Sequence, residues 1–433
     1  MDPATAAQNA LQCVLEAKKA ETLTIFCDDT RKEVGEAFEK GAQNLQLKTH
    51  LVVLKTEPQA FRTEIPKELD KYLVEEHADI YINLFRGIRE ETPFRIKLIH
   101  QETGDHKTRL GHCPGVTIDM LTKGALALTK AEHTEMQGFA HALKEKLKAA
   151  VKIEIATPAG TKLSLSLKGR PLVTDTMMDW ELMKWMNLPT GEVFAGPVET
   201  SLDGTLVCDL AIGGIGPIAS PVTIRVKRGK VYAVTSKDPE VLKRVQDSLH
   251  TDEMAKIVGE FAFGINPKAR FVEEFLETEK MFGTVHIAFG DNTDMPGGKN
   301  NSSNHMDFMM GKPAVNATLT DGSVVRVLEN GVFQEDTPTE KAAQLQEEKL
   351  PISEFYKVIN HVTIFKTDLW WEAIVLFELY GKPQVGMYLW QKRGGVWKRK
   401  NKFSFRTLGE WVAIKAATDQ LAQELGGKQQ SPT

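Results

Sequence analysis

Cysteine is scarce in this chain, and its four copies follow no metal-binding or disulfide pattern. Cys13, Cys27, Cys113 and Cys208 lie far apart, and the sequence contains no Cys-x-x-Cys pair. A large chain with few scattered thiols has neither the disulfide density of a small secreted domain nor a thiolate zinc site. We therefore expect core thiols, and nothing around His112-Cys113 indicates an activated nucleophile.

Long apolar runs are also missing, so no segment is suited to cross a bilayer. The first residues, Met-Asp-Pro-Ala-Thr-Ala-Ala-Gln, lack the basic and apolar parts of a secretory signal. We expect a cytoplasmic protein without a membrane partner.

The chain has no large excess of either charge, with a net charge of -4, 42% hydrophobic and 26% charged residues. This composition is typical of a globular protein and gives no global argument for a nucleic-acid or membrane surface. No Gly-x-Gly-x-x-Gly sequence is present to indicate a nucleotide. Its 433 residues exceed the usual size of one core, so two or three domains are expected.

Residues 1–150 alternate between apolar strands and helical patterns. Strands are expected at 22–27, 50–54 and 78–84, and helices at 32–45, 64–77, from 92 onward and over 123–151. This alternation predicts an α/β domain with a mostly parallel sheet. From Val151 the sequence pattern changes to short runs of alternating apolar and polar residues, separated by turns rich in Pro and Gly. Residues 151–335 are therefore predicted to form an antiparallel-sheet α+β domain, which also carries the candidate metal site described below.

Beyond a polar linker at 336–354, residues 355–433 are predicted to form a small module of four strands and a helix at 408–425. Aromatic and basic residues interleave in it; they are Trp370, Trp371, Trp390, Trp397, Lys392, Arg393, Lys398, Arg399, Lys400 and Lys402. This mixture can bind single-stranded nucleic acid by stacking and phosphate contact. The competing interpretation is a core filled by tryptophan with a solvated basic hairpin, and a dimer or substrate-gating contact is a third.

The stretch from Gly283 to Gly311 holds the strongest candidate site. It runs from a strand carrying His286, through a Gly/Asn/Ser loop, to a strand carrying His305 and Asp307. Positions i and i+2 of a strand point to the same face, so His305 and Asp307 can close on one ion. His286, from the neighbouring strand, would be a third ligand. A single strand-end histidine is usually structural, but this group suits zinc, cobalt, manganese or ferrous iron.

Two glutamates stand in apolar surroundings where an unpaired carboxylate would be costly. Glu192 lies in Thr-Gly-Glu-Val-Phe and Glu260 in Ile-Val-Gly-Glu-Phe-Ala-Phe. Each has a cation partner, faces outward or borders a functional cavity. Together with the His-x-Asp segment they would supply three carboxylates and two imidazoles, which is enough for two metal ions.

These segments resemble, in order and spacing, the thermophilic-type metalloaminopeptidase family, that of aminopeptidases T and S. The resemblance rests on Thr-Gly-Glu-Val-Phe, His-Ile-Ala-Phe-Gly and His-x-Asp, and it covers about residues 10–335. It implies a leucyl-aminopeptidase-like enzyme that hydrolyses N-terminal residues of peptides with two zinc, cobalt or manganese ions. The ligands implied by residue-wise match are Glu192, Glu260, His286, His305 and Asp307. A homodimer is the expected assembly.

One departure leaves the reaction open. The family has a tyrosine seven residues after its first histidine, where this chain has Thr293. Oxyanion stabilisation would then fall to metal, to Asn292 or to backbone N–H groups. Glu260 is the favoured carrier of the proton from water to the leaving amine.

Two alternatives remain. His286, His305 and Asp307 alone match the two-His, one-carboxylate set of ferrous oxygenases. A ring-opening dioxygenase that acts on dihydroxypyridine resembles the aminopeptidase family in its fold. The chain could also be a non-catalytic protein that binds nucleic acid or another partner through its C-terminal module.

Overall fold

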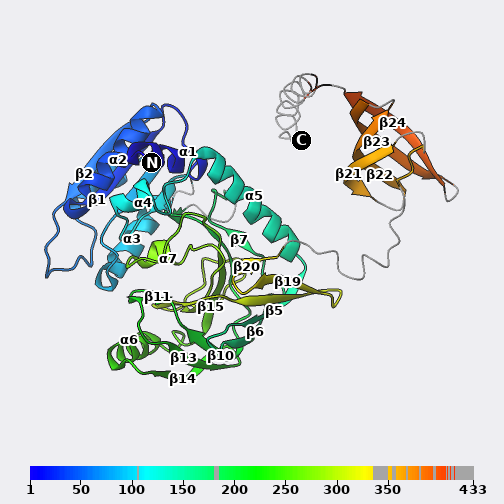
Figure 1. Ribbon diagram of the computed structural model, residues 1–433. Helices are drawn as coiled ribbons and strands as arrows, with labels where there is room; N and C mark the ends of the chain where they lie inside the picture. Colours follow the sequence, from blue (N-terminus) through cyan, green and yellow to red (C-terminus); the bar gives the residue numbers. More distant parts are fainter. Residues whose placement is uncertain are drawn as a thin grey trace, which may run out of the picture. The chain divides into compact units, whose positions relative to one another are not determined.

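The computed structural model describes residues 1–104, 107–179, 185–334, 350–353, 357–366, 369–379, 382–393 and 396–405, with residues 407, 410 and 414. The chain divides into two compact units, Met1–Glu335 and Asp336–Thr433. Figure 1 shows the first unit as a helix-rich part, in blue and cyan, that continues into strands in green and yellow.

A five-stranded parallel sheet of order β2-β1-β3-β4-β8 forms the N-terminal part. Its strands are β1 (Thr22–Asp28), β2 (Lys48–Leu54), β3 (Ile80–Leu84), β4 (Arg109–His112) and β8 (Trp185–Asn187). The accompanying helices are α1 (Pro3–Cys13), α2 (Lys32–Asn44), α3 (Thr92–Thr103) and α4 (Ile118–Thr122). The predicted mostly parallel sheet is confirmed.

Two predicted helices differ from the structure. Residues 64–77 form only short turns, a 3-10 turn at Lys67–Leu69 and a π turn at Lys71–Glu75. Leu69 and Leu73 are the only buried residues of those turns, too narrow an apolar stripe for a longer helix. The helix expected over 123–151 is α5 (Lys130–Leu147). It begins late because Thr129 and Glu132 form a reciprocal capping box that fixes its start.

From Ala150 onward the chain builds two antiparallel sheets, as predicted. The eight-stranded sheet has the order β14-β13-β10-β6-β5-β18-β19-β20 and the seven-stranded sheet the order β12-β11-β17-β16-β15-β9-β7. The strands of the first are β5 (Ala150–Ala156), β6 (Lys162–Ser166), β10 (Asp203–Cys208), β13 (Val222–Lys227), β14 (Lys230–Ser236), β18 (Ala314–Leu319), β19 (Val324–Glu329) and β20 (Val332–Phe333). Those of the second are β7 (Val173–Thr174), β9 (Glu192–Ala195), β11 (Ala211–Ile212), β12 (Gly216–Pro217), β15 (Val258–Gly264), β16 (Val285–Gly290) and β17 (His305–Met310).

One hydrophobic core joins these two sheets. It combines Ile153 and Leu206 of the eight-stranded sheet with Phe261, Ile287 and Phe308 of the seven-stranded sheet. Helices α6 (Pro239–Leu249) and α7 (Phe275–Thr278) complete the part. The core fixes one face of the seven-stranded sheet and leaves its other face for polar side chains.

The described residues of the second unit form a four-stranded antiparallel sheet of order β21-β22-β23-β24. Its strands are β21 (Lys357–Lys366), β22 (Trp370–Leu379), β23 (Lys382–Arg393) and β24 (Val396–Phe405). Trp371 and Trp390 are buried beside Phe377 and Tyr388, which confirms that they fill a core. The predicted helix 408–425 and most of the linker 336–354 lie outside the described residues.

The thiols are as expected. Cys27, Cys113 and Cys208 are buried, and all four cysteines are free. Burial raises the pKa of the Cys27 and Cys208 thiols to about 12 and also raises that of Cys113, so none is poised as a nucleophile. Among the described helices, none combines the length and apolar character needed to cross a membrane.

Candidate metal centre

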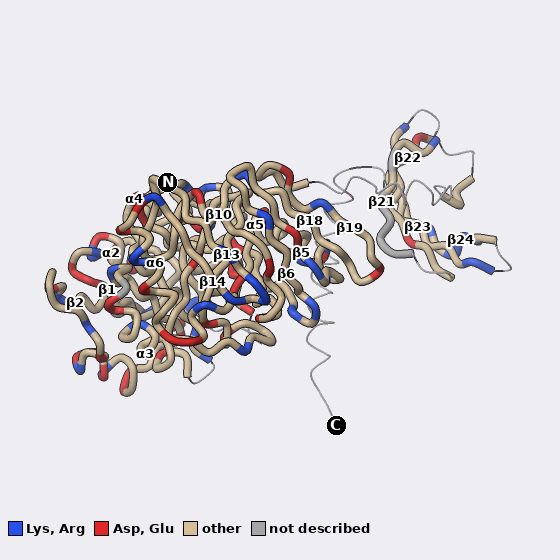
Figure 2. Tube along the Cα trace, turned by 90° about the horizontal axis from the view of Figure 1, so that it is seen from below, with Lys and Arg blue, Asp and Glu red and all other residues tan. Residues whose placement is uncertain are grey.

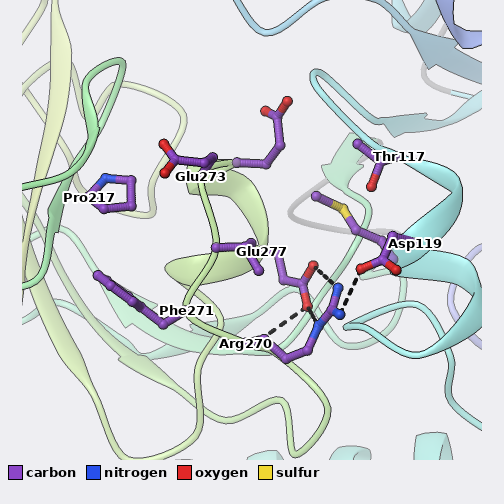
Figure 3. Close-up of a pocket in the computed structure, with 10 residues that line it drawn as sticks. Thr117, Asp119, Pro217, Arg270, Phe271, Glu273 and Glu277 are labelled. Atoms are coloured by element: carbon purple, nitrogen blue, oxygen red, sulfur yellow. Dashed lines mark hydrogen bonds and ion pairs between the residues drawn. The ribbon is translucent and has the colours of Figure 1, made fainter.

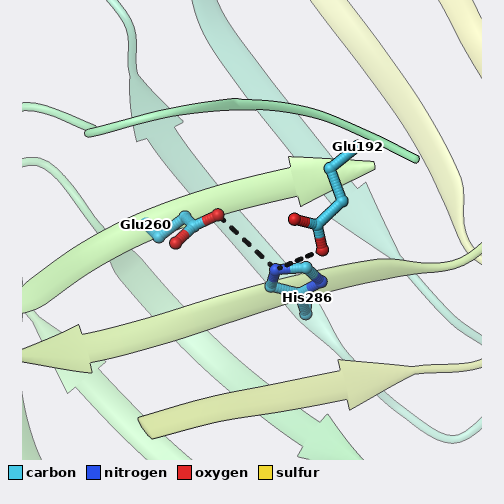
Figure 4. Close-up of side chains that lie close together, drawn as sticks. All are labelled: Glu192, Glu260 and His286. Carbon is cyan, nitrogen blue, oxygen red and sulfur yellow. Dashed lines mark ion pairs between the residues drawn. The ribbon is translucent and has the colours of Figure 1, made fainter. Parts of the chain in front are cut away.

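Four adjacent strands of the seven-stranded sheet bring the predicted site residues together. They are Glu192 on β9, Glu260 on β15, His286 on β16, and His305 and Asp307 on β17. Figure 4 shows Glu192 and Glu260 converging on the ring of His286 from two further strands. The expectation that β16 lies beside β17 is confirmed by their antiparallel register.

Strand alternation explains why polar groups gather on this face. Phe261, Ile287 and Phe308 directly follow Glu260, His286 and Asp307 in the sequence. They point into the hydrophobic core, so the preceding site residues point to the opposite face. Ala288 pairs with Glu260 on one side and with Asp307 on the other. Its methyl group is small, which leaves space between the two carboxylates.

The imidazoles face the carboxylates at short range. His286 Nε2 lies 3.6 Å from Glu192 Oε1, 3.6 Å from Glu260 Oε1 and 3.8 Å from Asp307 Oδ1. His305 Nε2 lies 3.2 Å from Glu260 Oε2 and 3.5 Å from Asp307 Oδ1. Two sets of three residues therefore share Glu260, and within each set the candidate ligand atoms lie within 4.8 Å of one another.

Two further observations fit the binding of a cation. The Nδ1 atom of His305 lies 2.9 Å from the Asp291 carbonyl oxygen, to which it can donate only as N–H, and this leaves Nε2 as the ligand atom. Glu192 Oε1 is buried and finds no hydrogen-bond partner among the described residues. A buried carboxylate oxygen without a partner is costly, and a metal ion beside His286 would satisfy it.

The charges of the five groups depend on one another. Burial opposes ionisation of Glu260, but the nearby imidazoles of His286 and His305 outweigh it and hold its pKa well below the usual value. Burial also opposes the charging of His305, yet Asp307 and Glu260 raise its pKa well above normal. In the absence of a cation the imidazoles thus hold protons that a metal would displace.

Three more buried residues extend the site, and the sequence analysis missed them. Lys280 Nζ lies 2.5 Å from Glu192 Oε2, 3.0 Å from Glu279 Oε1 and 3.5 Å from Asp175 Oδ2. The Asp175 Oδ1 atom accepts hydrogen bonds from the backbone N–H groups of Gly191 and Glu192. In sequence, Glu-Thr-Glu-Lys resembles an exposed charged turn, so only the buried setting of Lys280 reveals its role.

The loop between β16 and β17 engages Asn292 and Thr293 in hydrogen bonds with other residues of the chain. Thr293, at the position of the family's tyrosine, is exposed and hydrogen-bonds Asp291. The Asn292 amide donates to Glu199 Oε1 and accepts from the Asn300 backbone N–H. The Asn292 side chain thus helps to hold the loop, and its role in stabilising an oxyanion stays a prediction.

A hollow of about 480 Å³ lies elsewhere in the first unit and is shown in Figure 3. None of the five site residues lines it; Arg270 does, and its guanidinium is held by Glu277 and Asp119. The hairpin of β11 and β12 connects the two regions, since Pro217 lines the hollow and the Gly213 N–H donates to the Asp307 carbonyl. The candidate metal ligands therefore lie in the cluster on the sheet and not in this hollow.

Lys280→Met should destabilise the protein by about 3–5 kcal/mol, because it leaves buried carboxylates without their cation. The control is Lys268→Met, which breaks the partly exposed pair with Glu132 and should cost less than about 1 kcal/mol. Urea unfolding of both variants measures the difference. Equal losses would show that Lys280 contributes no more than a surface ion pair.

Chelator-treated protein should lose stability as the pH rises from about 5 through about 8. Burial raises the pKa of Glu279 to about 8, Lys280 opposes the rise and Glu192 adds to it. The folded chain therefore keeps a proton that the unfolded chain has already released. Glu279→Gln cannot titrate and should flatten the pH dependence of the free energy of unfolding. An unchanged slope in this variant would contradict the assignment.

Comparison with known proteins places this geometry in context. Residues 127–333 match the family model described as thermophilic metalloprotease (M29). A curated relative, 2,5-dihydroxypyridine 5,6-dioxygenase of Pseudomonas putida, is 24% identical over 180 residues, which cover 37% of this chain and 49% of the relative. The match thus spans about half of that protein's length.

Two solved structures share the fold. The 2,5-dihydroxypyridine dioxygenase from Pseudomonas putida KT2440 gives a TM-score of 0.58 at 18% identity and covers 78% of this chain and 98% of its own. AmpT from Thermus thermophilus gives a TM-score of 0.57 at 17% identity and covers 77% and 99%. A metalloprotease family implies a divalent metal, whose identity and number stay open. Residues 127–333 of this chain match the thermophilic metalloprotease family, and the resemblance read from its sequence motifs is confirmed for that part.

Proposed function

We propose that this protein is an aminopeptidase that hydrolyses N-terminal residues of peptides with two divalent metal ions. The observation that carries the proposal is the pair of three-residue sets that share Glu260. Glu192, His286 and Glu260 would hold one ion, and Glu260, His305 and Asp307 the other. Two such ions lower the pKa of a bound water towards about 7 and polarise a carbonyl.

Charge balance supports two ions rather than one. In the described part of the chain, the ammonium of Lys280 lies beside Asp175, Glu192 and Glu279, whereas Glu260 and Asp307 face only the imidazoles. Ionised carboxylates buried together need compensating cations. With neutral imidazoles and with Glu279 protonated below about pH 8, the other four carboxylates exceed Lys280 by three negative charges, which is more than one divalent ion would neutralise.

The surrounding residues orient the ligands. Lys280 binds Glu192 through Oε2 and leaves Oε1 directed at His286. Asp175 accepts two backbone N–H groups at the start of β9 and so fixes the strand from which Glu192 projects. The Asp291 carbonyl fixes the ring of His305. Glu260, within reach of both imidazoles, is the group we assign to carry the proton from water to the leaving amine.

A second candidate function is supported by a specific likeness. The curated relative and one structural neighbour are ring-opening dioxygenases, and His286, His305 and Asp307 alone would suit one ferrous ion. Thr293 in place of the family's tyrosine agrees with a changed reaction. Glu192 and Glu260, which an iron triad does not need, favour the peptidase. A cytoplasmic homodimer stays a prediction.

His305→Ala should lower any metal-dependent activity by more than about 100-fold, since loss of even an outer-shell partner costs about 10- to 100-fold. Glu260→Ala should abolish peptide hydrolysis but leave a ferrous triad largely working. The assays are release of the amine from an unblocked aminoacyl anilide with added zinc, cobalt or manganese, and ring opening of 2,5-dihydroxypyridine with ferrous iron in air.

His250→Ala, which removes an exposed histidine outside the cluster, is the control and should keep full activity. An N-acetylated anilide tests the need for a free amine. Ring opening that survives Glu260→Ala, with no hydrolysis in the wild type, would establish the dioxygenase and overturn the peptidase.

A further inference from the structure

The β23–β24 hairpin has a charge opposite to that of the whole chain. Residues 379–409 contain no Asp or Glu, whereas the complete chain has a net charge of -4. The basic residues of this stretch are Lys382, Lys392, Arg393, Lys398, Arg399, Lys400, Lys402 and Arg406. Figure 2 shows the blue segments along β23 and β24. A surface of one sign attracts a partner of the other sign.

The central basic residues of the hairpin are available to such a partner. Lys398, Arg399 and Lys400 are exposed, and the structure records no carboxylate within ion-pair distance of them in the part of the chain that it describes. Lysine on an edge strand can also serve only to prevent sheets from joining edge to edge. That role does not require the neighbouring strand β23 to be basic as well, as it is at Lys392 and Arg393.

An aromatic ring lies on the open face of the same strands. Trp371 and Trp390 are buried in the core and cannot stack on a ligand. Phe403 is 52% exposed and pairs with Met387 across the strands. It lines a hollow of about 350 Å³ whose charged lining residues are Lys402 and, from β22, Glu372. By register, Lys398 opposite Gln391 shares this open face with Met387 and Leu389, whereas Arg399 pairs with Trp390 and lies on the other face of the same edge strand.

We propose that the β23–β24 hairpin binds single-stranded nucleic acid. Phe403 stacks on a base and Lys398 contacts a phosphate on the same open face, while Arg399 and Lys400 contact further phosphates along the exposed edge strand β24. Phosphate contacts beside an exposed ring are the chemistry by which proteins hold single strands without reading sequence. A duplex would offer phosphates but no free base face, so the exposed ring favours the single strand. The binding is independent of the metal centre and adds a second activity to the chain.

The test uses the full chain and a fluorescein-labelled oligothymidylate of about 16 nucleotides, followed by anisotropy at several salt concentrations. Binding with a dissociation constant of about 1 μM or tighter at low salt is expected. The triple variant Lys398→Gln, Arg399→Gln, Lys400→Gln should reduce the slope of log affinity against log salt by about two, at roughly 0.7 per lost phosphate contact. Phe403→Ala should weaken binding at least about fivefold and leave the slope unchanged.

The matched control, Lys18→Gln, Lys19→Gln, Lys40→Gln, removes the same charge from exposed positions of the first unit and should bind as the wild type does. Four results would overturn the proposal. They are an equal loss in the control, equally tight binding of a duplex, no binding at about 100 μM, and binding of phosphatidylserine vesicles without binding of the oligonucleotide.

Discussion

Carboxylates that share a buried site repel one another, and the middle of this molecule is organised around that constraint. Glu192, Glu260 and Glu279 are almost fully buried, yet within the described ranges Lys280 is the one lysine or arginine recorded in an ion pair with any of them. Such a group is stable only when protons or cations reduce its negative charge. The imidazoles of His286 and His305 complete a set of nitrogen and oxygen donors suited to divalent ions.

The seven-stranded sheet holds these charged side chains close together because its opposite face is packed in the hydrophobic core. Each strand that carries a site residue also carries bulky apolar residues on the opposite face, where Phe261, Ile287 and Phe308 pack into the core. Packing of these residues in the core fixes the register of the strands. The register in turn fixes where the candidate ligand atoms of the five site residues lie. Small residues such as Ala288 then provide the space between the charged groups.

Much of this was accessible from sequence because the signals are local. His305 and Asp307 stand two apart on a strand, and Glu192 and Glu260 interrupt apolar runs, so strand alternation alone predicts a polar cluster. Lys280 and Asp175 gave no such signal, because their importance comes from contacts across the fold rather than from their neighbours in sequence. The pairing of β8 with β4 is equally non-local, and three residues at Trp185–Asn187 carry no pattern that could reveal it. The partners of Asn292, Glu199 and Asn300, also lie outside its own turn, so its part in holding the loop could not be predicted from sequence.

The number of divalent ions that each chain binds tests this account most directly. Chelator-treated protein, loaded with zinc, cobalt or manganese and dialysed, should retain about two ions per chain by elemental analysis. Glu192→Gln, which alters a ligand of one set only, should retain about one ion. A wild-type chain that retains a single ion under all loading conditions would contradict the two-ion site.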